Sequence, residues 1–410
     1  MHSRTPDWRC TSWAARKLLA ELADLYELDN RLDDARAAVE QGLNTAPGYP
    51  RLVIASARLA RRAGDPQACL DTLRRLDVQT LPPRLAMNYF QEAGLSLDRL
   101  EDTDQAVQAL TLANRINADS PRARAVDRSA YFAKLDAIEG WLERTDRTAP
   151  AADGPGRQLC FLIGMPRSGT TLLDTMLDAH PDVATVEEKP TMESVIATLA
   201  ESPAGYPEAI DELGESELED LRARYLERLH DHTGPSTSGL IVDKLPLRLV
   251  HTALIRRLFP GAKMLLILRH PCDVVLSNFM QLFEPTEAFV QTDTLEGAAQ
   301  LYDRVMSLWT RLRPLAEPVL ETLRYESLVA DPAGELERVC AFLGVDFHPD
   351  MVDDKARLAN RDRVRTNSYY QVAEAVHGRS AGRWLRYRAH LEPHLARLRP
   401  HAEALGYPLD

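Results

Sequence analysis

The residues best suited to chemistry lie in a run rich in Gly and hydroxyl groups, GMPRSGTT, between Gly164 and Thr171. The run follows the apolar stretch LCFLI and precedes a helical pattern, so it falls where a strand turns into a helix. Backbone N–H groups at such a turn can converge on a phosphate, and the helix dipole favours the negative charge. The run also keeps the G-x-x-x-x-G frame of a phosphate-binding loop. The sequence therefore predicts that this loop binds an anion.

Two departures from the loop of a nucleoside triphosphatase argue against phosphoryl transfer. Thr170 stands where such loops carry the Lys that reaches the β- and γ-phosphates, and Arg167 comes earlier in the loop. A second apolar run ends in Arg269 rather than in the Asp that would complete a magnesium site. The pattern favours an anion cradle without metal or γ-phosphate chemistry over a kinase or nucleoside triphosphatase. It also favours that cradle over a Gly-rich turn with no ligand.

Short apolar runs bounded by turns predict the buried parallel strands that position this loop. These runs are Cys160–Gly164, Leu240–Lys244, Met264–Arg269 and Pro318–Glu326. Helical patterns separate them, at Thr171–Ala179, Glu215–His232, Leu247–Leu258, Leu295–Arg313 and Ala333–Leu343. Strands that alternate with helices predict an α/β domain, three layers thick, with a mostly parallel sheet.

The first third of the chain has a different pattern, dense in Ala, Leu and Arg and poor in Gly. Three segments place a short turn before an Ala, at Ala35, Ala68 and Ala106, which are 33 and 38 residues apart. A period of about 34 residues with a small side chain at the helix crossing is typical of tetratricopeptide repeats. We therefore predict a tetratricopeptide-like all-α domain over residues 1–144, with a generic helical bundle as the alternative. A linker rich in Pro, Gly and Ala follows over 145–158, and the α/β domain occupies 159–410.

Composition limits the class of protein. The formal net charge of -12 argues against nucleic-acid binding by the surface as a whole. The five cysteines are scattered and form no C-x-x-C pair, which indicates reduced thiols in a cytosol. The N-terminal residues lack the apolar region of a signal peptide, and no apolar run reaches the roughly 18 to 20 residues of a membrane span. We expect a soluble, cytoplasmic protein.

The octapeptide PRSGTTLL, Pro166–Leu173, resembles the 5′-phosphosulfate loop of sulfotransferases that use 3′-phosphoadenylyl sulfate (PAPS). It is most similar to the Arg-containing loop of tyrosylprotein sulfotransferases, and to that of bacterial proteins that join tetratricopeptide repeats to a sulfotransferase domain. The resemblance covers residues from about 158 to about 390. It implies that PAPS is the donor, that PAP is the product and that no metal takes part. It also implies that the donor is held by Pro166, Arg167, Ser168, Gly169, Thr170, Thr171 and Leu172.

Two further motifs carry the resemblance toward the nucleotide. In RHPCDVVLSN, Arg269 and Ser277 have the eight-residue spacing of the family's 3′-phosphate site. Arg can grip a phosphate with two hydrogen bonds, and the Ser hydroxyl supplies another donor. RYESL resembles the family's R-Y-E-D-L, which implies that Tyr325 packs near the adenine.

The resemblance also assigns the groups that transfer the sulfuryl group. The family places a Glu 21 residues after the loop Arg, which is Glu188 here, with the adjacent Glu187 as the alternative base. Lys244 in VDKLP resembles the Lys of D-K-x-P, which can offset charge on the bridging oxygen of the donor. Arg167 would act in the same way on the sulfuryl oxygens.

The segment Arg363–Tyr387 resembles the family's closing loop over the nucleotide. The resemblance places Ser368 at the sulfate ester, and Arg383 and Trp384 where the family carries Lys and Trp. HGRSAG departs from the R-K-G of the small-molecule branch, so Arg379 is a candidate substitute at the 3′-phosphate.

These features together predict a PAPS-dependent sulfotransferase whose helical repeats dock a hydroxyl acceptor, with protein or peptide tyrosine first. A saccharide, lipid or small metabolite is the alternative, because the segments 191–239 and 282–294 would shape the acceptor cleft. A repeat scaffold with a catalytically silent domain is a second alternative, against which the complete set of site residues speaks. Whether the chain forms a homodimer is left open.

Overall fold

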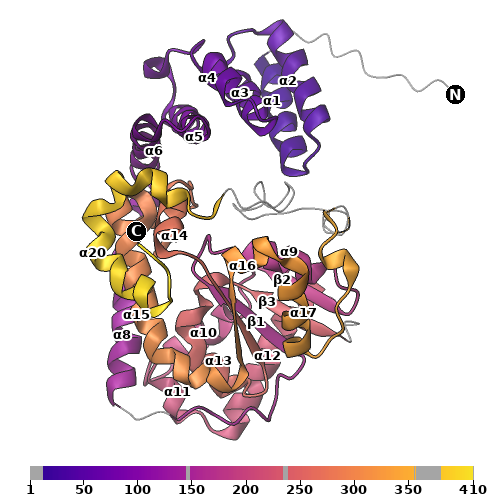
Figure 1. The fold of residues 1–410 in the computed structure, drawn as a ribbon, viewed down its shortest axis with the longest axis vertical. Helices are drawn as coiled ribbons and strands as arrows, with labels where there is room; N and C mark the ends of the chain where they lie inside the picture. The colour runs from indigo at the N-terminus through magenta and orange to yellow at the C-terminus, as the bar shows by residue number, and fades with distance from the viewer. Residues whose placement is uncertain (1–12, 145–147, 234–238, 355, 357–379, 410) are drawn as a thin grey trace, which may run out of the picture. The chain divides into compact units, whose positions relative to one another are not determined.

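The computed structural model describes residues 13–144, 148–233, 239–354, 356 and 380–409. The chain forms two compact units. Of the described residues, the first unit contains 13–126 and 279–294, and the second contains the rest. Figure 1 gives the labels of the elements used below. None of the described helices is both long and apolar enough to cross a membrane.

The first unit is all-helical, as the sequence predicts. Consecutive helices pack in pairs, α1 with α2, α3 with α4 and α5 with α6. Ala35 and Ala106 are fully buried, whereas in the second pair the buried position is Cys69 and Ala68 is only half-buried. Whether these hairpins are tetratricopeptide repeats stays a prediction. The helices of this unit are α1 (Trp13–Leu28), α2 (Leu32–Thr45), α3 (Pro50–Arg62), α4 (Pro66–Leu73), η1 (Val78–Thr80), α5 (Pro83–Arg99), α6 (Thr103–Ala118), α7 (Pro121–Arg124) and η3 (Phe289–Asp293).

Two of the three short turns that precede an Ala are capping sites, whereas the turn before α2 has no side-chain cap. The Asp65 carboxylate accepts the Ala68 N–H at 2.8 Å and begins α4, and Asp102 accepts the Gln105 N–H at 3.2 Å and begins α6. Each cap satisfies a backbone donor that the helix itself leaves without a partner, and typically contributes about 1 kcal/mol. The repeated turn-then-Ala pattern therefore marks where the second helix of a pair begins.

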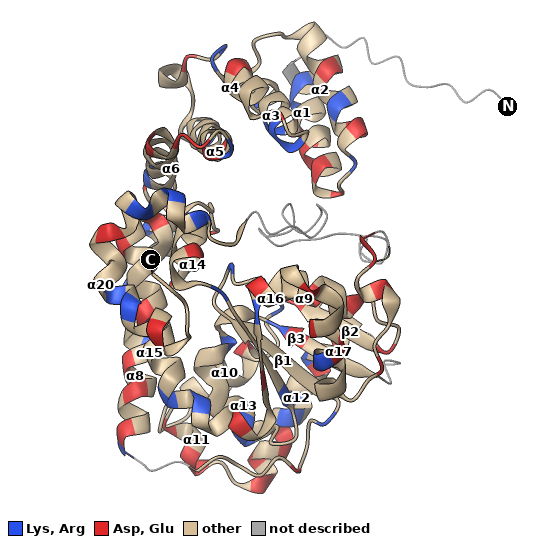
Figure 2. Ribbon diagram, viewed as in Figure 1, with Lys and Arg blue, Asp and Glu red and all other residues tan. Residues whose placement is uncertain are grey.

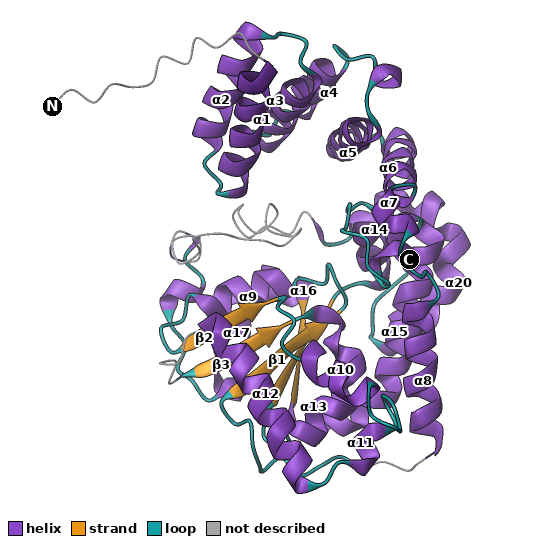
Figure 3. Ribbon diagram, turned by 180° about the vertical axis from the view of Figure 1, so that it is seen from behind, coloured by secondary structure: helices purple, strands orange, loops and turns teal. Residues whose placement is uncertain are grey.

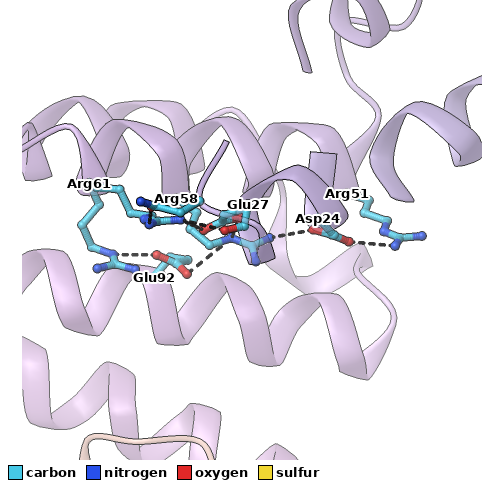
Figure 4. A network of polar contacts seen from close by, with 8 residues as sticks. Asp24, Glu27, Arg51, Arg58, Arg61 and Glu92 are labelled. Carbon is cyan, nitrogen blue, oxygen red and sulfur yellow. Dashed lines mark hydrogen bonds and ion pairs between the residues drawn. The ribbon is translucent and has the colours of Figure 1, made fainter. Parts of the chain in front are cut away.

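A network of acidic and basic side chains joins α1, α3 and α5 (Figure 4). Glu27 of α1 pairs with Arg58 at 3.3 Å and with Arg62 at 3.3 Å, and Glu92 of α5 pairs with Arg61 at 2.7 Å. Both carboxylates are buried, and burial raises the pKa of Glu27. Figure 2 shows acidic and basic residues interspersed along α1 to α3. The pairs therefore connect successive hairpins through their first helices.

The segment Phe279–Thr294 belongs to the helical unit although it comes far later in the chain. Asn114 of α6 is buried and donates to the Phe279 carbonyl at 2.9 Å. Gln91 of α5 donates to the Met280 carbonyl, also at 2.9 Å. Side-chain amides of two helices thus satisfy backbone carbonyls that come just before residues 282–294, which the sequence assigns to the acceptor cleft.

The second unit is built on one five-stranded parallel sheet with the order β2-β3-β1-β4-β5. This order puts β1, which leads into the anion loop, at the centre. The sequence predicts four of these strands and misses β2, a short edge strand. The strands are β1 (Leu159–Gly164), β2 (Val183–Glu187), β3 (Leu240–Lys244), β4 (Lys263–Leu268) and β5 (Leu320–Arg324).

Helices cover both faces of the sheet (Figure 3). Every residue of β1 is buried, and its side chains alternate between two cores. Cys160 and Leu162 join a cluster with α9 and α17, whereas the Phe161 ring lies 5.8 Å from that of Tyr225 in α12. The predicted three-layer α/β domain, preceded by an all-helical region, is therefore confirmed.

The helices of the second unit are α8 (Ala130–Arg144), α9 (Thr170–Asp178), α10 (Glu193–Ala200), α11 (Ala209–Glu212), α12 (Glu215–Thr233), η2 (Pro246–His251), α13 (Thr252–Leu258), α14 (Pro271–Phe279), α15 (Leu295–Ala316), η4 (Glu317–Val319), α16 (Tyr325–Ala330), α17 (Pro332–Leu343), η5 (Pro349–Met351), η7 (Arg383–Tyr387) and α20 (Arg388–Ala404). Parallel strands end at one edge of their sheet, so β1, β2, β3 and β4 deliver the residues that follow them to the same side.

Candidate active site

The anion loop follows β1 and ends where α9 begins, and its glycines are required by geometry. A Cβ on Gly164 would lie 2.6 Å from the Ile267 carbonyl oxygen of the neighbouring strand. Gly169 has φ 105, and a Cβ there would lie 2.6 Å from the Tyr325 ring. The first glycine thus lets two strands approach closely, and the second lets the loop turn into α9 against an aromatic ring.

Side chains from the motif that follows β4 hold the loop's carbonyl groups. Asn278 donates to the Pro166 carbonyl at 2.9 Å, and Arg269 donates to the Arg167 carbonyl at 3.0 Å. These carbonyl oxygens are therefore bonded to protein donors and do not oppose an incoming anion. The sequence predicts Arg269 at this site but misses Asn278, whose only signal is its place directly after Ser277.

Two buried donors at the loop have no hydrogen-bond partner among the described residues. They are the Ser168 hydroxyl and the Nε of Arg269, and both residues are at most 5% exposed. A buried donor without a partner carries a desolvation cost of about 1–3 kcal/mol. An oxyanion bound in the loop would supply acceptors, so the donor set fits a phosphate or sulfate group.

Positive charge is concentrated beside the loop. Arg167 is buried and donates from Nε to the Ser277 hydroxyl at 3.2 Å. Burial and the nearby guanidinium groups of Arg269 and Arg383 lower the pKa of Arg167 to about 10. The Arg269 guanidinium also lies 4.8 Å from the centre of the Tyr325 ring. The arrangement brings cations close together, and a bound polyanion would relieve their repulsion.

A second cluster forms where β2 and β3 end side by side. The Lys244 ammonium is fully buried and lies 2.8 Å from Glu187 Oε1 and 2.9 Å from Glu188 Oε1. It also donates to the Thr171 hydroxyl of α9 at 3.3 Å. Although burial lowers the pKa of Lys244, the carboxylates of Glu188, Asp174 and Glu187 raise it overall. Lys244 is therefore a protonated cation held between two carboxylates and the anion loop.

Glu187 and Glu188 differ in access and in backbone conformation. The Glu188 side chain is 41% exposed and that of Glu187 is 15% exposed. Among the described residues of the second unit, Arg167 (φ 72) and Glu188 (φ 49) are the non-glycine residues with a left-handed backbone. Such conformations cost about 1–3 kcal/mol each and cluster at functional sites. The resemblance assigns catalytic roles to the same two residues, so their backbone conformation provides separate support for them.

Comparison with known proteins agrees with this geometry. Residues 160–349 match the family model described as "Sulfotransferase family", and this range contains the loop, the Lys–Glu cluster and the Arg269 motif. These residues form a domain of the sulfotransferase family. The resemblance predicted from PRSGTTLL and the later motifs is therefore confirmed at the level of the family.

The relatives of this sulfotransferase domain are distant. An uncharacterized protein of Aquifex aeolicus is 27% identical over 313 residues, which are 72% of this chain and 39% of that protein. Protein-tyrosine sulfotransferase 1 of Danio rerio is 28% identical over 270 residues, which are 61% of this chain and 74% of that protein. A solved sulfotransferase domain from the curacin biosynthetic pathway is 21% identical, with a TM-score of 0.44, over 63% of this chain and 99% of that domain.

The C-terminal part of the second unit returns to the anion site. The buried Asp273 carboxylate accepts the N–H groups of Gly382 at 2.7 Å and of Trp384 at 2.8 Å. The Trp384 ring is 2% exposed and stacks on His270, with ring centres 4.7 Å apart. Arg269 also donates to the Ser380 carbonyl. This part of the predicted closing segment is thus fastened to the motif after β4.

The outcome for the predicted site residues is as follows. The structure brings the loop residues together with Lys244, Glu187 and Glu188 on one side and with Arg269, Ser277, Tyr325 and Arg383 on the other. Trp384 lies behind this group, against His270. Ser368 and Arg379 fall outside the described residues. Among the residues that are described, no three His, Cys, Asp or Glu side chains gather as a candidate metal site.

Proposed function

We propose that this chain transfers a sulfuryl group from PAPS to the hydroxyl of an acceptor, with PAP as the product. The observation that carries the proposal is the meeting of an Arg-rich anion site with a Lys–Glu cluster at one edge of the sheet. Transfer to a hydroxyl needs an anion site for the donor, a cation at the leaving oxygen and a base for the acceptor. Membership of the sulfotransferase family supports the same reading.

The donor site is assigned from the chain's own groups. The Ser168 hydroxyl and the backbone of the loop would hold the 5′-phosphosulfate, which supplies the group to be transferred. Arg269 and Ser277 would hold the 3′-phosphate, and the Tyr325 ring, which packs on Gly169, would border the adenine. The donors of Ser168 and Arg269 that have no partner among the described residues support this assignment.

The catalytic roles follow from access and charge. Glu188, the more exposed of the two carboxylates, takes the proton of the acceptor hydroxyl, with Glu187 as the alternative. Lys244 offsets charge on the oxygen that leaves, and Arg167 offsets charge on the sulfuryl oxygens. The side chains of Lys244 and Thr171 already touch, which links the cation to the donor loop. Ser368 is proposed at the sulfate ester from the resemblance alone.

The acceptor we favour is a tyrosine of a peptide or protein, docked by the helical unit. A relative named protein-tyrosine sulfotransferase supports this choice, as does a proposed Glu base beside an Arg-containing loop. A saccharide, lipid or small metabolite is the second candidate. The third candidate is a catalytically silent scaffold, in which the domain would bind PAP but would not transfer a sulfuryl group.

Thermal unfolding with nucleotides tests the donor assignment. PAP should raise the melting temperature well above the effect of AMP, which lacks the 3′-phosphate, and EDTA should leave that difference unchanged. Equal shifts from PAP and AMP would remove the 3′-phosphate site from the proposal. Stabilisation by ATP with magnesium, without a response to PAP, would instead favour phosphoryl transfer.

A further inference from the structure

The loop that carries the proposed base runs from the end of β2 to the start of α10. Its backbone is held at several points. The Glu188 N–H donates to the Lys244 carbonyl at 2.7 Å, which continues the pairing of β2 with β3 by one residue. The Lys189 carbonyl accepts two donors, the Arg248 guanidinium at 2.7 Å and the Thr191 N–H at 2.8 Å. The loop is therefore anchored immediately on both sides of the Glu188 side chain.

The side chains of the same loop are tied to the same neighbours. The Thr191 hydroxyl donates to Asp243 Oδ2 at 2.7 Å. The Glu193 carboxylate accepts from Arg248 at 3.2 Å. Residues 189, 191 and 193 thus all bond to Asp243 or Arg248, which come from β3 and from the turn η2 that follows it.

These anchors form a buried cluster. Asp243 and Arg248 are each 1% exposed and form an ion pair with each other. Thr191 is fully buried, and the Tyr225 hydroxyl of α12 also donates to Asp243 Oδ2, at 2.7 Å. An ion pair in such surroundings adds little net stability, because desolvation offsets the attraction, and apolar residues of similar volume are often as stable. The cluster is therefore better explained by the geometry that it imposes.

The cluster affects the placement of two groups in the proposed chemistry, the Lys244 cation and the Glu188 base. Asp243 and Lys244 are neighbours on β3, so their side chains point to opposite faces of the sheet. Lys244 reaches Thr171 of α9 on one face, and Asp243 reaches Tyr225 of α12 on the other. One strand end therefore sets the position of the cation directly and the position of the base loop through Asp243 and Arg248.

We propose that Thr191, Asp243 and Arg248 are positioning residues that hold the Glu188 loop against Lys244. The role of Glu188 as the base rests on the proposed function. The hydrogen bonds that hold the Glu188 loop do not depend on it. None of the three needs to touch donor or acceptor. Their effect would be to fix the distance between the base and the cation, and errors of about 1 Å in such placement can cost about 10²-fold in rate.

Thr191→Val tests the tie with little change in volume, and Thr252→Val is its matched control. Both threonines are fully buried, and each hydroxyl donates a 2.7 Å hydrogen bond, Thr191 to Asp243 and Thr252 to the Leu249 carbonyl. Hydrogen exchange of the amides 188–193, the Kd for PAP and the rate of transfer from PAPS would be measured on the full chain. We expect similar losses of melting temperature in the two variants. Only Thr191→Val should speed exchange in this loop and lower kcat, by about 10- to 100-fold, with the Kd for PAP and the KM for PAPS within about twofold. Thr191→Ser, which keeps the hydroxyl, should restore kcat.

Several results would overturn the inference. One is the same rate of hydrogen exchange at amides 188–193 in Thr191→Val and in Thr252→Val. Another is faster exchange at these amides in Thr191→Val with an unchanged kcat. A third is failure of Thr191→Ser to restore the rate, since the hydroxyl would then not be the active feature. If the parent chain binds PAP but transfers to no acceptor, the proposed function fails instead. The exchange data would then still decide whether Thr191 holds the loop.

Discussion

Lys244 and Glu188 form an ion pair, with Nζ and Oε1 2.9 Å apart, at the ends of two strands that lie side by side. The cation is fully buried, whereas the carboxylate is 41% exposed. The base proposed for the acceptor and the cation proposed for the leaving oxygen are thus within reach of one reacting bond. The buried end of the pair contacts Thr171 at the anion loop, and its other end is partly exposed to solvent.

Replacing Lys244 by Met should lower both stability and transfer. The variant removes the ammonium group that lies 2.8 Å from the mostly buried Glu187 carboxylate, which we expect to cost about 2–4 kcal/mol of unfolding free energy. Adding Glu187→Gln to Lys244→Met should recover part of that loss, because the more buried of the two remaining carboxylate charges is removed. Urea titrations of the single and double variants measure both effects. Additive losses in the double variant would contradict the coupling.

Arg269→Ala should selectively weaken the binding of PAP. Loss of hydrogen bonds from a charged donor typically costs about 1.5–3 kcal/mol, or roughly 10- to 150-fold in the Kd for PAP. The Kd for AMP should change much less, because AMP lacks the 3′-phosphate. Isothermal titration with both nucleotides measures the ratio, and circular dichroism checks the fold. An unchanged Kd for PAP would show that Arg269 does not bind the 3′-phosphate.

Gly169→Ala should destabilise the chain more than Gly64→Ala, although both glycines have a positive φ. A Cβ at Gly169 would meet Tyr325 at 2.6 Å, whereas nothing lies within 4 Å of a Cβ at Gly64. Gly64→Ala should therefore lower the free energy of unfolding only by the backbone cost of about 1–2 kcal/mol. Gly169→Ala should lower it by the same cost plus about 1–3 kcal/mol from overpacking against Tyr325. Denaturant titrations measure the difference. Equal losses would argue against close packing of the loop on Tyr325.

Glu27 gives the helical unit a pH-dependent stability. Burial, helped by the Glu92 carboxylate, raises the pKa of Glu27 above its unfolded value of 4.5 despite Arg58 and Arg62. The ionised carboxylate therefore lowers the free energy of unfolding at pH 7, and this loss of stability disappears as the pH falls through the folded pKa and below 4.5. Glu27→Gln should unfold at a higher temperature than the parent at pH 7, with a difference that shrinks as the pH falls toward 5.

The control for Glu27 is Glu21→Gln, which removes the same charge from an exposed side chain of α1. The melting temperatures of both variants and of the parent would be measured at pH 7 and at pH 5. A difference between Glu27→Gln and the parent that does not change between these two pH values would contradict the pKa shift.

The sequence was sufficient to predict those features whose functional residues lie next to a clear strand or helix pattern in the chain. The anion loop could be predicted because a strand, two glycines and a helix start are adjacent in the chain. Lys244 and Arg269 could be predicted because both end apolar runs, and these runs become the strands on either side of β1. The short edge strand β2 was missed, since its five residues alternate only weakly and two of them are partly exposed threonine and alanine.

Features that depend on contacts between distant segments could not be predicted. Asn278, Asp243 and Arg248 look like ordinary polar residues of a helix, a strand and a turn. Each also bonds to a distant partner, and these partners (Pro166, Tyr225 and Lys189) lie 18 to 112 residues away. Nothing in the composition of Phe279–Thr294 indicates that it packs with the helical unit, because the bonds from Asn114 and Gln91 go to its backbone.

The most direct test of the central claim is sulfuryl transfer itself, measured by mass spectrometry as the gain of one SO₃ group. The parent chain and Glu188→Gln would be incubated with PAPS and a panel of tyrosine peptides, saccharides and lipids. We predict that an acceptor gains SO₃ with the parent, and that Glu188→Gln loses at least about 10²-fold in rate while it still binds PAP. No gain on any acceptor, or an equal rate with Glu188→Gln, would contradict the account.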